Sequence, residues 1–332
     1  MRRVAVLGAG SWGTTLAIHL SRIGHETQLW GRDPALVGDL QVRRANAVYL
    51  PDLSFPASLH PTDSVREALA GASLVVAAVP SHGMRGILGQ AAAFIESGAT
   101  IVSATKGLEH ETLFRGSEII EQELGPTARI AVLSGPSFAA EVARQLPTAV
   151  CVASRDPAIV EHVQHDFRAP YFRLYGTSDV VGVELGGALK NVIAIAAGVA
   201  EGLGLGHNAV AGLITRGLAE MTRLACAAGG HRETLAGLTG LGDLVLTCTG
   251  SLSRNRHVGI ELARGRQLPE VLAGMKMVAE GVRTTEVALA LAARHGVELP
   301  IATQVGEVLA GRKDALTALY DLMLRPQRAE AE

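Results

Sequence analysis

The chain has 332 residues, of which 48% are hydrophobic and 19% are charged, a composition that is typical of a globular protein and excludes wholesale disorder. At roughly 100–200 residues per domain, this length suits two packed domains. The 30 basic and 32 acidic residues give a formal charge of −2 with no dominant block of either sign, which argues against a nucleic-acid partner. The three cysteines lack CxxC spacing, so we expect reduced thiols and no metal site.

The start of the chain resembles a signal peptide only superficially. Arg2 and Arg3 precede an apolar run at 4–7, far shorter than the roughly 7–15 residues of a signal-peptide core. The longest apolar stretch, at 191–200, is well below the ~20 residues that a bilayer requires. We therefore expect a cytoplasmic protein without membrane insertion.

The first half of the chain alternates short apolar runs with stretches of helical spacing. The runs lie at 4–7, 27–30, 74–79, 100–104, 130–133 and 149–153. They lack the alternation of a one-sided sheet, and strands buried on both faces belong to parallel sheets covered by helices. We predict an α/β, Rossmann-like doubly wound sheet domain over 1–178, with its ligands at the carboxyl ends of the strands.

The second half of the chain has a different pattern. Apolar residues recur at three- and four-residue spacings, with glycines between the periodic segments, which lie at 180–200, 209–228, 252–265 and 282–295. Strand-like runs nearly vanish. This pattern predicts an all-α C-terminal domain over 179–332.

The turn after the first predicted strand carries the GxGxxG pattern of Gly8, Gly10 and Gly13. Gly8 allows a tight turn, Gly10 lets a pyrophosphate approach the backbone, and Gly13 permits close packing of helix on strand. The helix that follows offers free N–H groups and a positive dipole end. The turn therefore predicts a dinucleotide site.

The residue at the end of the second predicted strand bears on which dinucleotide binds. Arg32 stands 24 residues after Gly8 and precedes Asp33. An acidic residue at this place binds the ribose 2′-hydroxyl, whereas an arginine accommodates a 2′-phosphate. We expect NADP, with NADPH preferred, and NAD remains possible.

Lysine is scarce: 26 of the 30 basic residues are arginine, and the four lysines are Lys106, Lys190, Lys276 and Lys313. A partly buried ammonium can release a proton, which arginine does not, so these lysines are candidate acid–base groups. Lys190 lies in an apolar helical segment, where an ammonium is costly without a partner. Lys106 follows the predicted strand at 100–104, at the sheet edge where a cofactor should lie.

Two segments of the C-terminal half suggest a substrate site. Residues 250–257 precede a helix, and Ser253, Arg254 and Asn255 would form a set of donors suited to a phosphate, which Arg256 could join. A basic surface cap fits the same residues. Upstream, Asp243 lies in an apolar, glycine-rich stretch that we expect to be a loop. Such a carboxylate needs a cationic partner, and Lys190 is the candidate.

Taken together, the motifs resemble bacterial NAD(P)-dependent glycerol 3-phosphate dehydrogenase over nearly the whole chain. The matching segments are Gly-Ala-Gly-Ser-Trp-Gly at 8–13, Thr-Lys-Gly-Leu at 105–108, Ser-Gly-Pro-Ser-Phe-Ala at 134–139, Gly-Ala-Leu-Lys-Asn at 187–191, Gly-Leu-Gly-Asp at 240–243, Ser-Arg-Asn at 253–255 and Val-Ala-Glu-Gly at 278–281. Ordered segments across both halves are more specific than GxGxxG alone.

The resemblance implies site residues by position. Cofactor contacts would come from Ser11, Trp12, Arg32, Tyr49, Lys106, Ala139, Arg254, Val278 and Glu280. Substrate contacts would come from Lys106, Gly135, Ser137, Lys190, Asp243, Ser253, Arg254 and Asn255. Lys190 would transfer the proton, Asp243 would orient its ammonium, and Lys106 would add positive charge toward the substrate.

The implied activity is the reversible NAD(P)H-dependent reduction of dihydroxyacetone phosphate to sn-glycerol 3-phosphate, supplying glycerophospholipid synthesis in a cytoplasmic homodimer. Two alternatives stay open. One is another two-domain NADP-dependent dehydrogenase, acting on a ketopantoate-like substrate or a 2-oxo or hydroxy acid. The other is an NADP sensor without catalysis, which would have no need of Lys190 opposite Asp243.

Overall fold

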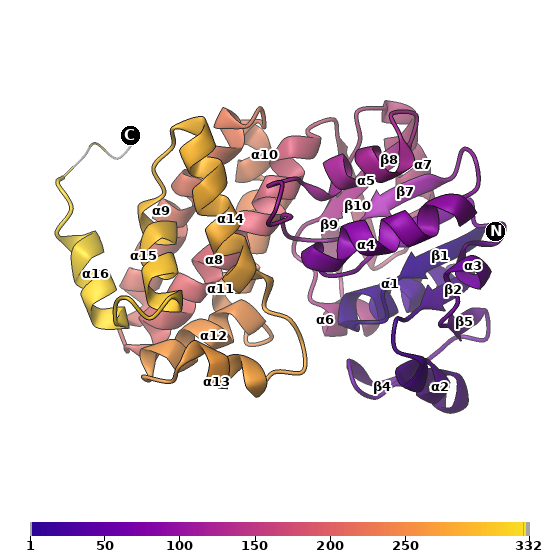
Figure 1. The fold of residues 1–332 in the computed structure, drawn as a ribbon, viewed down its shortest axis with the longest axis horizontal. Coiled ribbons are helices and arrows are strands. Elements are labelled where there is room, and N and C mark those ends of the chain that lie inside the picture. Colours follow the sequence, from indigo (N-terminus) through magenta and orange to yellow (C-terminus); the bar gives the residue numbers. More distant parts are fainter. Residues whose placement is uncertain (1, 328, 330–332) are drawn as a thin grey trace.

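The computed structural model describes residues 2–327 and 329. A sheet domain and a helical domain lie side by side along the long axis of the molecule (Figure 1). The last strand of the sheet ends at Thr177, and the first helix of the second domain begins at Val180. The predicted α/β fold with an all-α C-terminal domain is confirmed.

Within the described residues, the main sheet has eight strands in the order β10-β9-β8-β7-β6-β1-β2-β5. Their bounds are β1 Arg3–Leu7, β2 Glu26–Trp30, β5 Leu59–Thr62, β6 Leu74–Ala77, β7 Thr100–Ser103, β8 Arg129–Ser134, β9 Thr148–Ala153 and β10 Phe172–Thr177. The strands from β5 to β8 pair in parallel, so their carboxyl ends meet at one edge. Each predicted apolar run forms one of these strands.

The expected parallel pairing is wrong for one of the six predicted strands. The run at 149–153 forms β9, which pairs antiparallel with β8, and β10 follows β9 in parallel. Burial on both faces is a property that either pairing direction can give, so the apolar pattern could not distinguish them. The pattern also missed β10, whose buried Phe172 and Leu174 alternate with exposed Arg173 and Tyr175 at the edge of the sheet.

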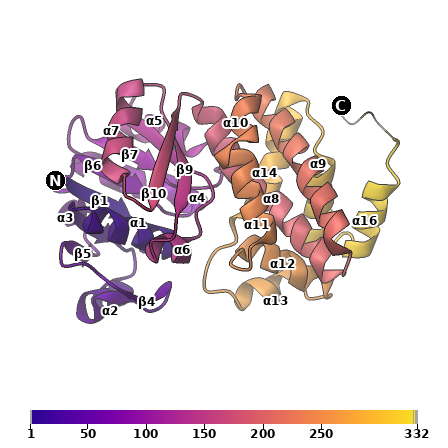
Figure 2. The ribbon, with the colours of Figure 1, turned by 180° about the vertical axis from the view of Figure 1, so that it is seen from behind.

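Helices cover both faces of the sheet. They are α1 Ser11–Arg22, α2 Pro34–Arg43, α3 Val65–Leu69, α4 Ser81–Ala91, α5 Gly116–Leu124, α6 Ala139–Ala143 and α7 Pro157–Phe167, with a 3₁₀ turn η1 at Ala92–Phe94. Helices α3, α4 and α5 pack on one face (Figure 1), and α1, α6 and α7 pack on the other (Figure 2). Successive residues of β1 alternate between the two cores: Val4 and Val6 contact the α1 side, and Ala5 and Leu7 the α4 side. A short hairpin of β3 Ala45–Asn46 and β4 Leu50–Ser54 lies apart from the main sheet.

The helical domain is built around α8 Val180–Gly202. Its other helices are α9 Gly206–Ala227, α10 Arg232–Ala236, the π-helical η2 Leu238–Gly242, α11 Asp243–Thr249, α12 Arg254–Ala263, α13 Leu268–Ala273, α14 Glu280–His295, α15 Pro300–Leu309 and α16 Ala315–Met323. By length and composition α8 could cross a membrane, but 94% of its most apolar window is buried inside the protein. It is the core helix of this domain.

Two glycines bring α8 and α12 together. A Cβ on Gly198 would lie 1.9 Å from the carbonyl oxygen of Arg256, and a Cβ on Gly259 would lie 2.0 Å from that of Ile195. Only glycine permits this backbone approach. The contact holds the start of α12 beside the middle of α8, which carries Lys190.

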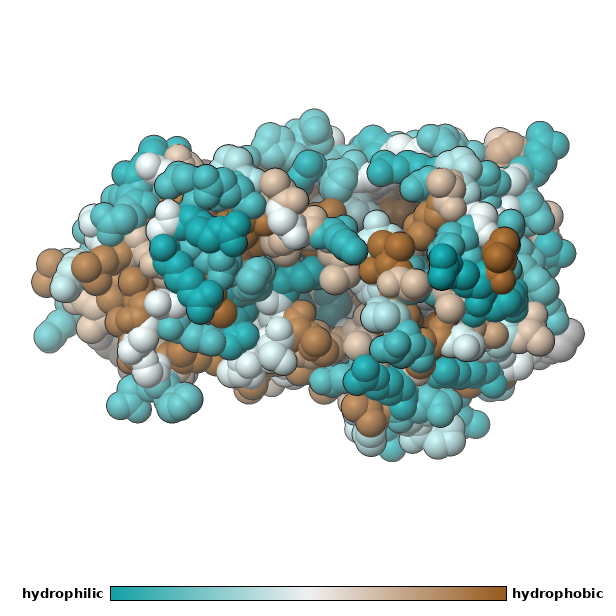
Figure 3. Space-filling view, turned by 90° about the horizontal axis from the view of Figure 1, so that it is seen from below, coloured by the Kyte–Doolittle hydropathy of each residue, from teal (hydrophilic) through white to brown (hydrophobic). Residues whose placement is uncertain are grey.

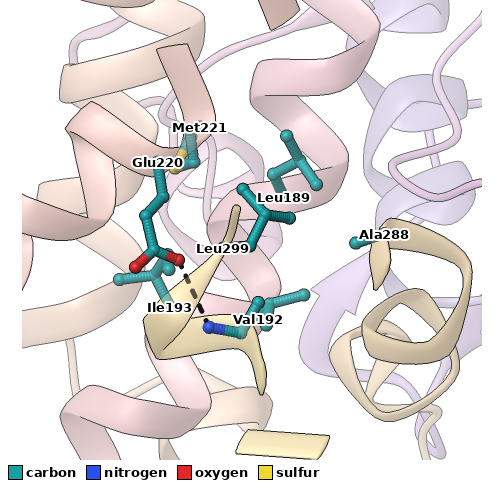
Figure 4. Close-up of a pocket in the computed structure, with 8 residues that line it drawn as sticks. Leu189, Val192, Ile193, Glu220, Met221, Ala288 and Leu299 are labelled. Atoms are coloured by element: carbon teal, nitrogen blue, oxygen red, sulfur yellow. Dashed lines mark hydrogen bonds between the residues drawn. The ribbon is translucent and has the colours of Figure 1, made fainter. Parts of the chain in front are cut away.

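A small cavity of about 10 Å³ lies in the helical core, lined by Leu189, Val192, Ile193, Glu220, Met221, Ala288, Leu299 and Ala302 (Figure 4). The carboxylate of Glu220 accepts hydrogen bonds from the backbone N–H groups of Ile301 at 2.7 Å and Ala302 at 3.3 Å. Glu220 thereby caps the first turn of α15. None of the predicted site residues lines this cavity.

Candidate active site

The glycine-rich turn joins β1 to α1 and has the geometry that its pattern predicted. Gly8 has φ +121°, and a Cβ on it would lie 2.6 Å from the carbonyl oxygen of Ala78. A Cβ on Gly13 would lie only 1.8 Å from the carbonyl oxygen of Gly8. A Cβ on Gly10, by contrast, would have no described atom within 4 Å. Gly8 and Gly13 are therefore required by packing, whereas the space beside Gly10 is open.

The first turn of α1 suits an anionic group. Gly10 occupies the N-cap and has no side chain with which to cap the helix, and the turn carries no acidic residue. The positive end of the helix dipole and its N–H groups therefore face the open space. The indole Nε1 of Trp12 is buried without a hydrogen-bond partner among the described residues. The N–H groups of this first turn fit the phosphates of a dinucleotide.

Arg32 and Asp33 follow β2, and both residues are exposed. One carboxylate oxygen of Asp33 caps α2, accepting a hydrogen bond from the backbone N–H of Ala35 at 3.0 Å. The helix cap thus engages part of the acid that could bind a ribose 2′-hydroxyl, and the Arg32 side chain stands next to it.

Tyr49 lies in the turn of the β3–β4 hairpin. Asn46, which sequence reasoning missed, joins this hairpin to the glycine-rich turn. Asn46 is buried and donates to the carbonyl oxygen of Ala9 at 3.0 Å and to Thr14 Oγ1 at 2.8 Å. Its Oδ1 accepts from the backbone N–H of Tyr49 at 3.1 Å. No motif marked Asn46, because its role depends on contacts with a distant segment.

The centre of the site is a buried group of two lysines and one aspartate. Lys190 Nζ donates to Asp243 Oδ1 at 2.5 Å and to Thr247 Oγ1 at 2.8 Å. Lys106 Nζ donates to Asp243 Oδ2 at 2.7 Å, so the two oxygens of one carboxylate bind the two ammonium groups. Asp243 and Lys190 have side chains 1% and 8% exposed, against 17% for Lys106. The predicted pairing of Asp243 with Lys190 is present, and Lys106 is a second partner that was not predicted.

Burial and charge set the proton affinity of Lys190. Burial lowers its pKa to about 8, because water cannot solvate the ammonium. Asp243 opposes this shift and Lys106 adds to it. A lysine with a pKa near 8 exchanges a proton readily close to neutral pH, as a general acid or base requires.

Lys106 also connects this group to the loop after β8. Its Nζ donates to the carbonyl oxygen of Gly135 at 2.7 Å and to Ser137 Oγ at 3.2 Å. Gly135 has φ +130°, a conformation that favours glycine. At the end of the same loop, Ala139 begins α6, and its carbonyl oxygen accepts from Thr15 Oγ1 of α1 at 3.1 Å. The loop therefore touches both the lysine group and the helix of the glycine-rich turn.

The start of α12 lies against α8 through a pair of amides. Asn255 Nδ2 donates to Asn191 Oδ1 at 2.9 Å, and Asn255 Oδ1 accepts from the backbone N–H of Gly281 at 2.9 Å. Ser253 caps α12 by accepting from the backbone N–H of Arg256 at 3.2 Å. Arg254 is exposed beside them and interacts electrostatically with Glu280.

Two expectations about this region are corrected. Asp243 is the first residue of α11, after the π-helical turn η2, and does not lie in a loop. The helix explains Thr247, which sequence reasoning missed: it stands four residues later, on the same helix face, and reaches Lys190. Arg256 does not join the donors around Ser253, because its guanidinium pairs with Glu201 at 2.5 Å.

The segment between α13 and α14 reaches across to the sheet domain. Ser11 Oγ, in the first turn of α1, donates to the sulfur of Met277 at 3.0 Å. Glu280 accepts from the backbone N–H of Ser81 at 3.2 Å and from Ser81 Oγ at 2.8 Å. Val278, between them, is 39% exposed. These contacts bring the predicted residues of this segment to the edge where α1 and α4 begin.

Comparison with known proteins agrees with this geometry. The family described as NAD-dependent glycerol-3-phosphate dehydrogenase matches with its N-terminal part at residues 3–160 and its C-terminal part at 179–320. Glycerol-3-phosphate dehydrogenase [NAD(P)+] of Koribacter versatilis is 54% identical over 82% of this chain and 81% of its own length; that of Geobacter metallireducens is 52% identical over 81% of each. The crystal structure of glycerol-3-phosphate dehydrogenase from Coxiella burnetii superposes with a TM-score of 0.94 at 40% identity, covering 97% of this chain and 98% of the other. No group of three or more metal-binding side chains occurs among the residues that the structure describes. The chain belongs to the NAD-dependent glycerol-3-phosphate dehydrogenase family.

Proposed function

We propose that the protein catalyses the reversible NAD(P)H-dependent reduction of dihydroxyacetone phosphate to sn-glycerol 3-phosphate, which supplies glycerophospholipid synthesis. The observation that carries this proposal is the buried lysine of the helical domain, Lys190, held by Asp243 beside Lys106 of the sheet domain. The position of this lysine between the two domains of a dehydrogenase-family chain supports its role as the proton donor.

Residues of the sheet domain would hold the cofactor, with help from the segment before α14. Gly8, Gly10, Gly13, Ser11 and Trp12 would bind the pyrophosphate at the start of α1, where the N–H groups are directed toward open space. The remaining contacts would come from Arg32, Tyr49, Lys106, Ala139, Arg254, Val278 and Glu280. When bound, NAD(P)H supplies the hydride that reduces the carbonyl carbon. Because Arg32 is exposed after β2 and Asp33 caps α2, we expect NADPH to be preferred and NAD to be possible.

The helical domain would hold the substrate. Ser253, Arg254 and Asn255 at the start of α12 offer a hydroxyl, a guanidinium and an amide at a positive helix end, which suits a phosphate. Gly135 and Ser137, which already contact Lys106, would line the other side. The small phosphorylated substrate would then lie between α12 and Lys106.

Lys190 would carry the proton. In reduction its ammonium stabilises the alkoxide that develops as the carbonyl is reduced, and then gives that oxygen a proton. In oxidation the neutral amine takes the hydroxyl proton, and solvent restores the charge state after each turnover. Asp243 orients the ammonium, and the positive charge of Lys106 attracts the anionic substrate.

The domains would divide these tasks, with nucleotide binding in residues 1–178 and substrate binding in residues 179–332. We also propose that the enzyme works in the cytoplasm without membrane insertion, since its single long apolar helix within the described residues is a buried core helix.

A homodimer is the proposed assembly, with the contact on the helical domain. A groove of about 550 Å³ runs between α8, α9, α15 and α16. Hydrophobic residues gather at this end of the molecule (Figure 3), where Tyr320, Met323 and Leu324 on and after α16 are 56%, 74% and 81% exposed. Patches of this kind mark protein contacts. Light scattering after size exclusion should give twice the chain mass, and Met323→Asp should shift it toward the monomer.

One assay separates this function from the alternatives. The loss of NADPH absorbance is followed with dihydroxyacetone phosphate, pyruvate and ketopantoate, in wild type and Lys190→Met. We expect turnover with dihydroxyacetone phosphate alone, and its loss in Lys190→Met. Faster turnover of either acid would make the protein a different dehydrogenase, and NADPH binding without turnover of any substrate would make it a sensor.

A further inference from the structure

The loop that carries Lys106 is strained at its far end. It runs from the end of β7 to the start of α5, at 104–115. Leu113 has φ +66°, a left-handed conformation that costs a leucine energy. Backbone hydrogen bonds close a turn there, from Leu113 N–H to the Glu109 carbonyl at 3.0 Å and from Glu109 N–H to the Phe114 carbonyl at 2.9 Å. Such a conformation persists only where surrounding contacts enforce it.

Glu109 supplies those contacts. Its side chain is 7% exposed, and both carboxylate oxygens accept from the guanidinium of Arg85 on α4, from Nε at 2.7 Å and from Nη2 at 2.6 Å. Thr112 Oγ1 donates to the same carboxylate at 2.5 Å. A two-point pairing fixes orientation as well as distance. The loop is therefore clamped to α4 three residues after Lys106.

The helix that holds this clamp also bears on the interdomain contact. Ser81 begins α4 and binds Glu280 of the helical domain, while Arg85 follows one turn later. Gly107, next to Lys106, is packed against Ser81 and Glu280: a Cβ on it would lie 2.8 Å from the Ser81 side chain and 2.9 Å from Glu280 Oε2. The Lys106 loop is therefore confined at Gly107 by the interdomain contact and at Glu109 by the clamp.

We propose that Arg85 and Glu109 are positioning residues, which hold the Lys106 loop so that its ammonium meets Asp243 in the substrate site. This inference deepens the proposed function and rests on it for the kinetic part of its test. Lys106 reaches Asp243, Gly135 and Ser137 at hydrogen-bond distance. A displacement of about 1 Å would lengthen all of these contacts, and errors of that size can cost about 100-fold in rate.

The chain provides a matched control. Arg85 Nη1 pairs with Glu123 of α5 at 2.6 Å, so Glu123 binds the same guanidinium from outside the loop. Glu109→Gln and Glu123→Gln each remove one carboxylate charge from the same guanidinium. Only Glu109→Gln should release the loop. Arg85→Lys keeps the charge but loses the two-point fork, so it should behave like Glu109→Gln.

The first measurement does not depend on activity. With only four lysines in the chain, amine-reactive labelling followed by mass spectrometry reports on each one. Lys106 is partly protected in the wild type, with its side chain 17% exposed. Glu109→Gln and Arg85→Lys should raise its labelling rate several-fold and leave Lys313 unchanged. Glu123→Gln should label like the wild type.

The second measurement is kinetic. Glu109→Gln should raise the KM for dihydroxyacetone phosphate by about tenfold, with the Kd for NADPH nearly unchanged. Because the Lys106 charge lowers the pKa of Lys190, its withdrawal should also raise the pH at which the rate of reduction falls. A loss of stability alone would change neither the KM for dihydroxyacetone phosphate nor this pH. Equal labelling and equal KM in Glu109→Gln and Glu123→Gln would overturn the proposal. Absence of turnover in the wild type would overturn the proposed function, and the labelling result would still decide the clamp.

Discussion

Lys190 Nζ lies 2.5 Å from Oδ1 of Asp243, although 53 residues separate the two in the chain. Both groups are buried, so neither charge would be stable without the other. Lys106 binds the second oxygen of Asp243, so the three side chains together carry a net positive charge. An anionic substrate would supply the balance.

The pH dependence should differ in sign between the two reaction directions. Reduction needs the ammonium form of Lys190, whose pKa burial lowers to about 8, so its rate should fall as pH rises through that value. Oxidation needs the neutral amine, so its rate should rise over the same range. Single-turnover measurements in both directions test this. If the two rates change in the same direction with pH, Lys190 is not the proton-transferring residue.

Replacement of Asp243 by Asn should cost roughly 100-fold in kcat, because two ammonium groups then face each other without a counter-charge. The attraction that raises the pKa of Lys190 would also be lost, so the rate of reduction should fall at a lower pH than in the wild type. If the rate of reduction by Asp243→Asn falls at the same pH as in the wild type, the pairing of Asp243 with Lys190 is contradicted.

Thr247→Val removes only one hydrogen bond to Lys190 and should raise the activation barrier by about 1 kcal/mol.

Arg32→Ala should erase the preference for NADPH over NADH, as measured by the ratio of kcat/KM values. The matched control is Asp33→Ala, which removes the α2 cap and should cost about 1 kcal/mol of stability without changing the ratio. If Arg32→Ala keeps the wild-type ratio, Arg32 does not bind the 2′-phosphate.

Two alanine substitutions in the glycine-rich turn should separate folding from binding. Gly13→Ala would press a Cβ against the carbonyl oxygen of Gly8 and should destabilise the fold by about 2–3 kcal/mol in urea unfolding. Gly10→Ala meets open space, so its stability should stay near wild type while its Kd for NADPH rises about tenfold or more. Normal NADPH binding by Gly10→Ala would exclude the turn as the pyrophosphate site.

His19 should make the protein less stable in acid. It is buried on α1, with Nδ1 2.9 Å from the Tyr171 hydroxyl and Nε2 2.8 Å from the Phe167 carbonyl. Burial lowers its pKa from 6.5 to about 4, with His25 and Arg22 adding to the shift. The unfolded chain therefore binds a proton below about pH 6.5 that the folded chain does not. This linkage should remove up to roughly 3 kcal/mol by pH 4. Urea unfolding of His19→Gln should show a weaker dependence over this range, and an identical slope would contradict the assignment.

The sequence by itself determined the elements whose cause is local. The glycines at 8, 10 and 13, the apolar runs and the three- and four-residue periodicity predicted the dinucleotide turn, six strands and the helical second domain, because burial and backbone conformation leave a pattern within a few residues. The tertiary structure decided the rest. It reversed β9 against β8, committed Asp33 to a helix cap, and joined Asp243 to Lys106 across 137 residues. Pairing direction, charge partners and the pKa of Lys190 depend on which distant groups share a buried space, and no short stretch of sequence encodes that.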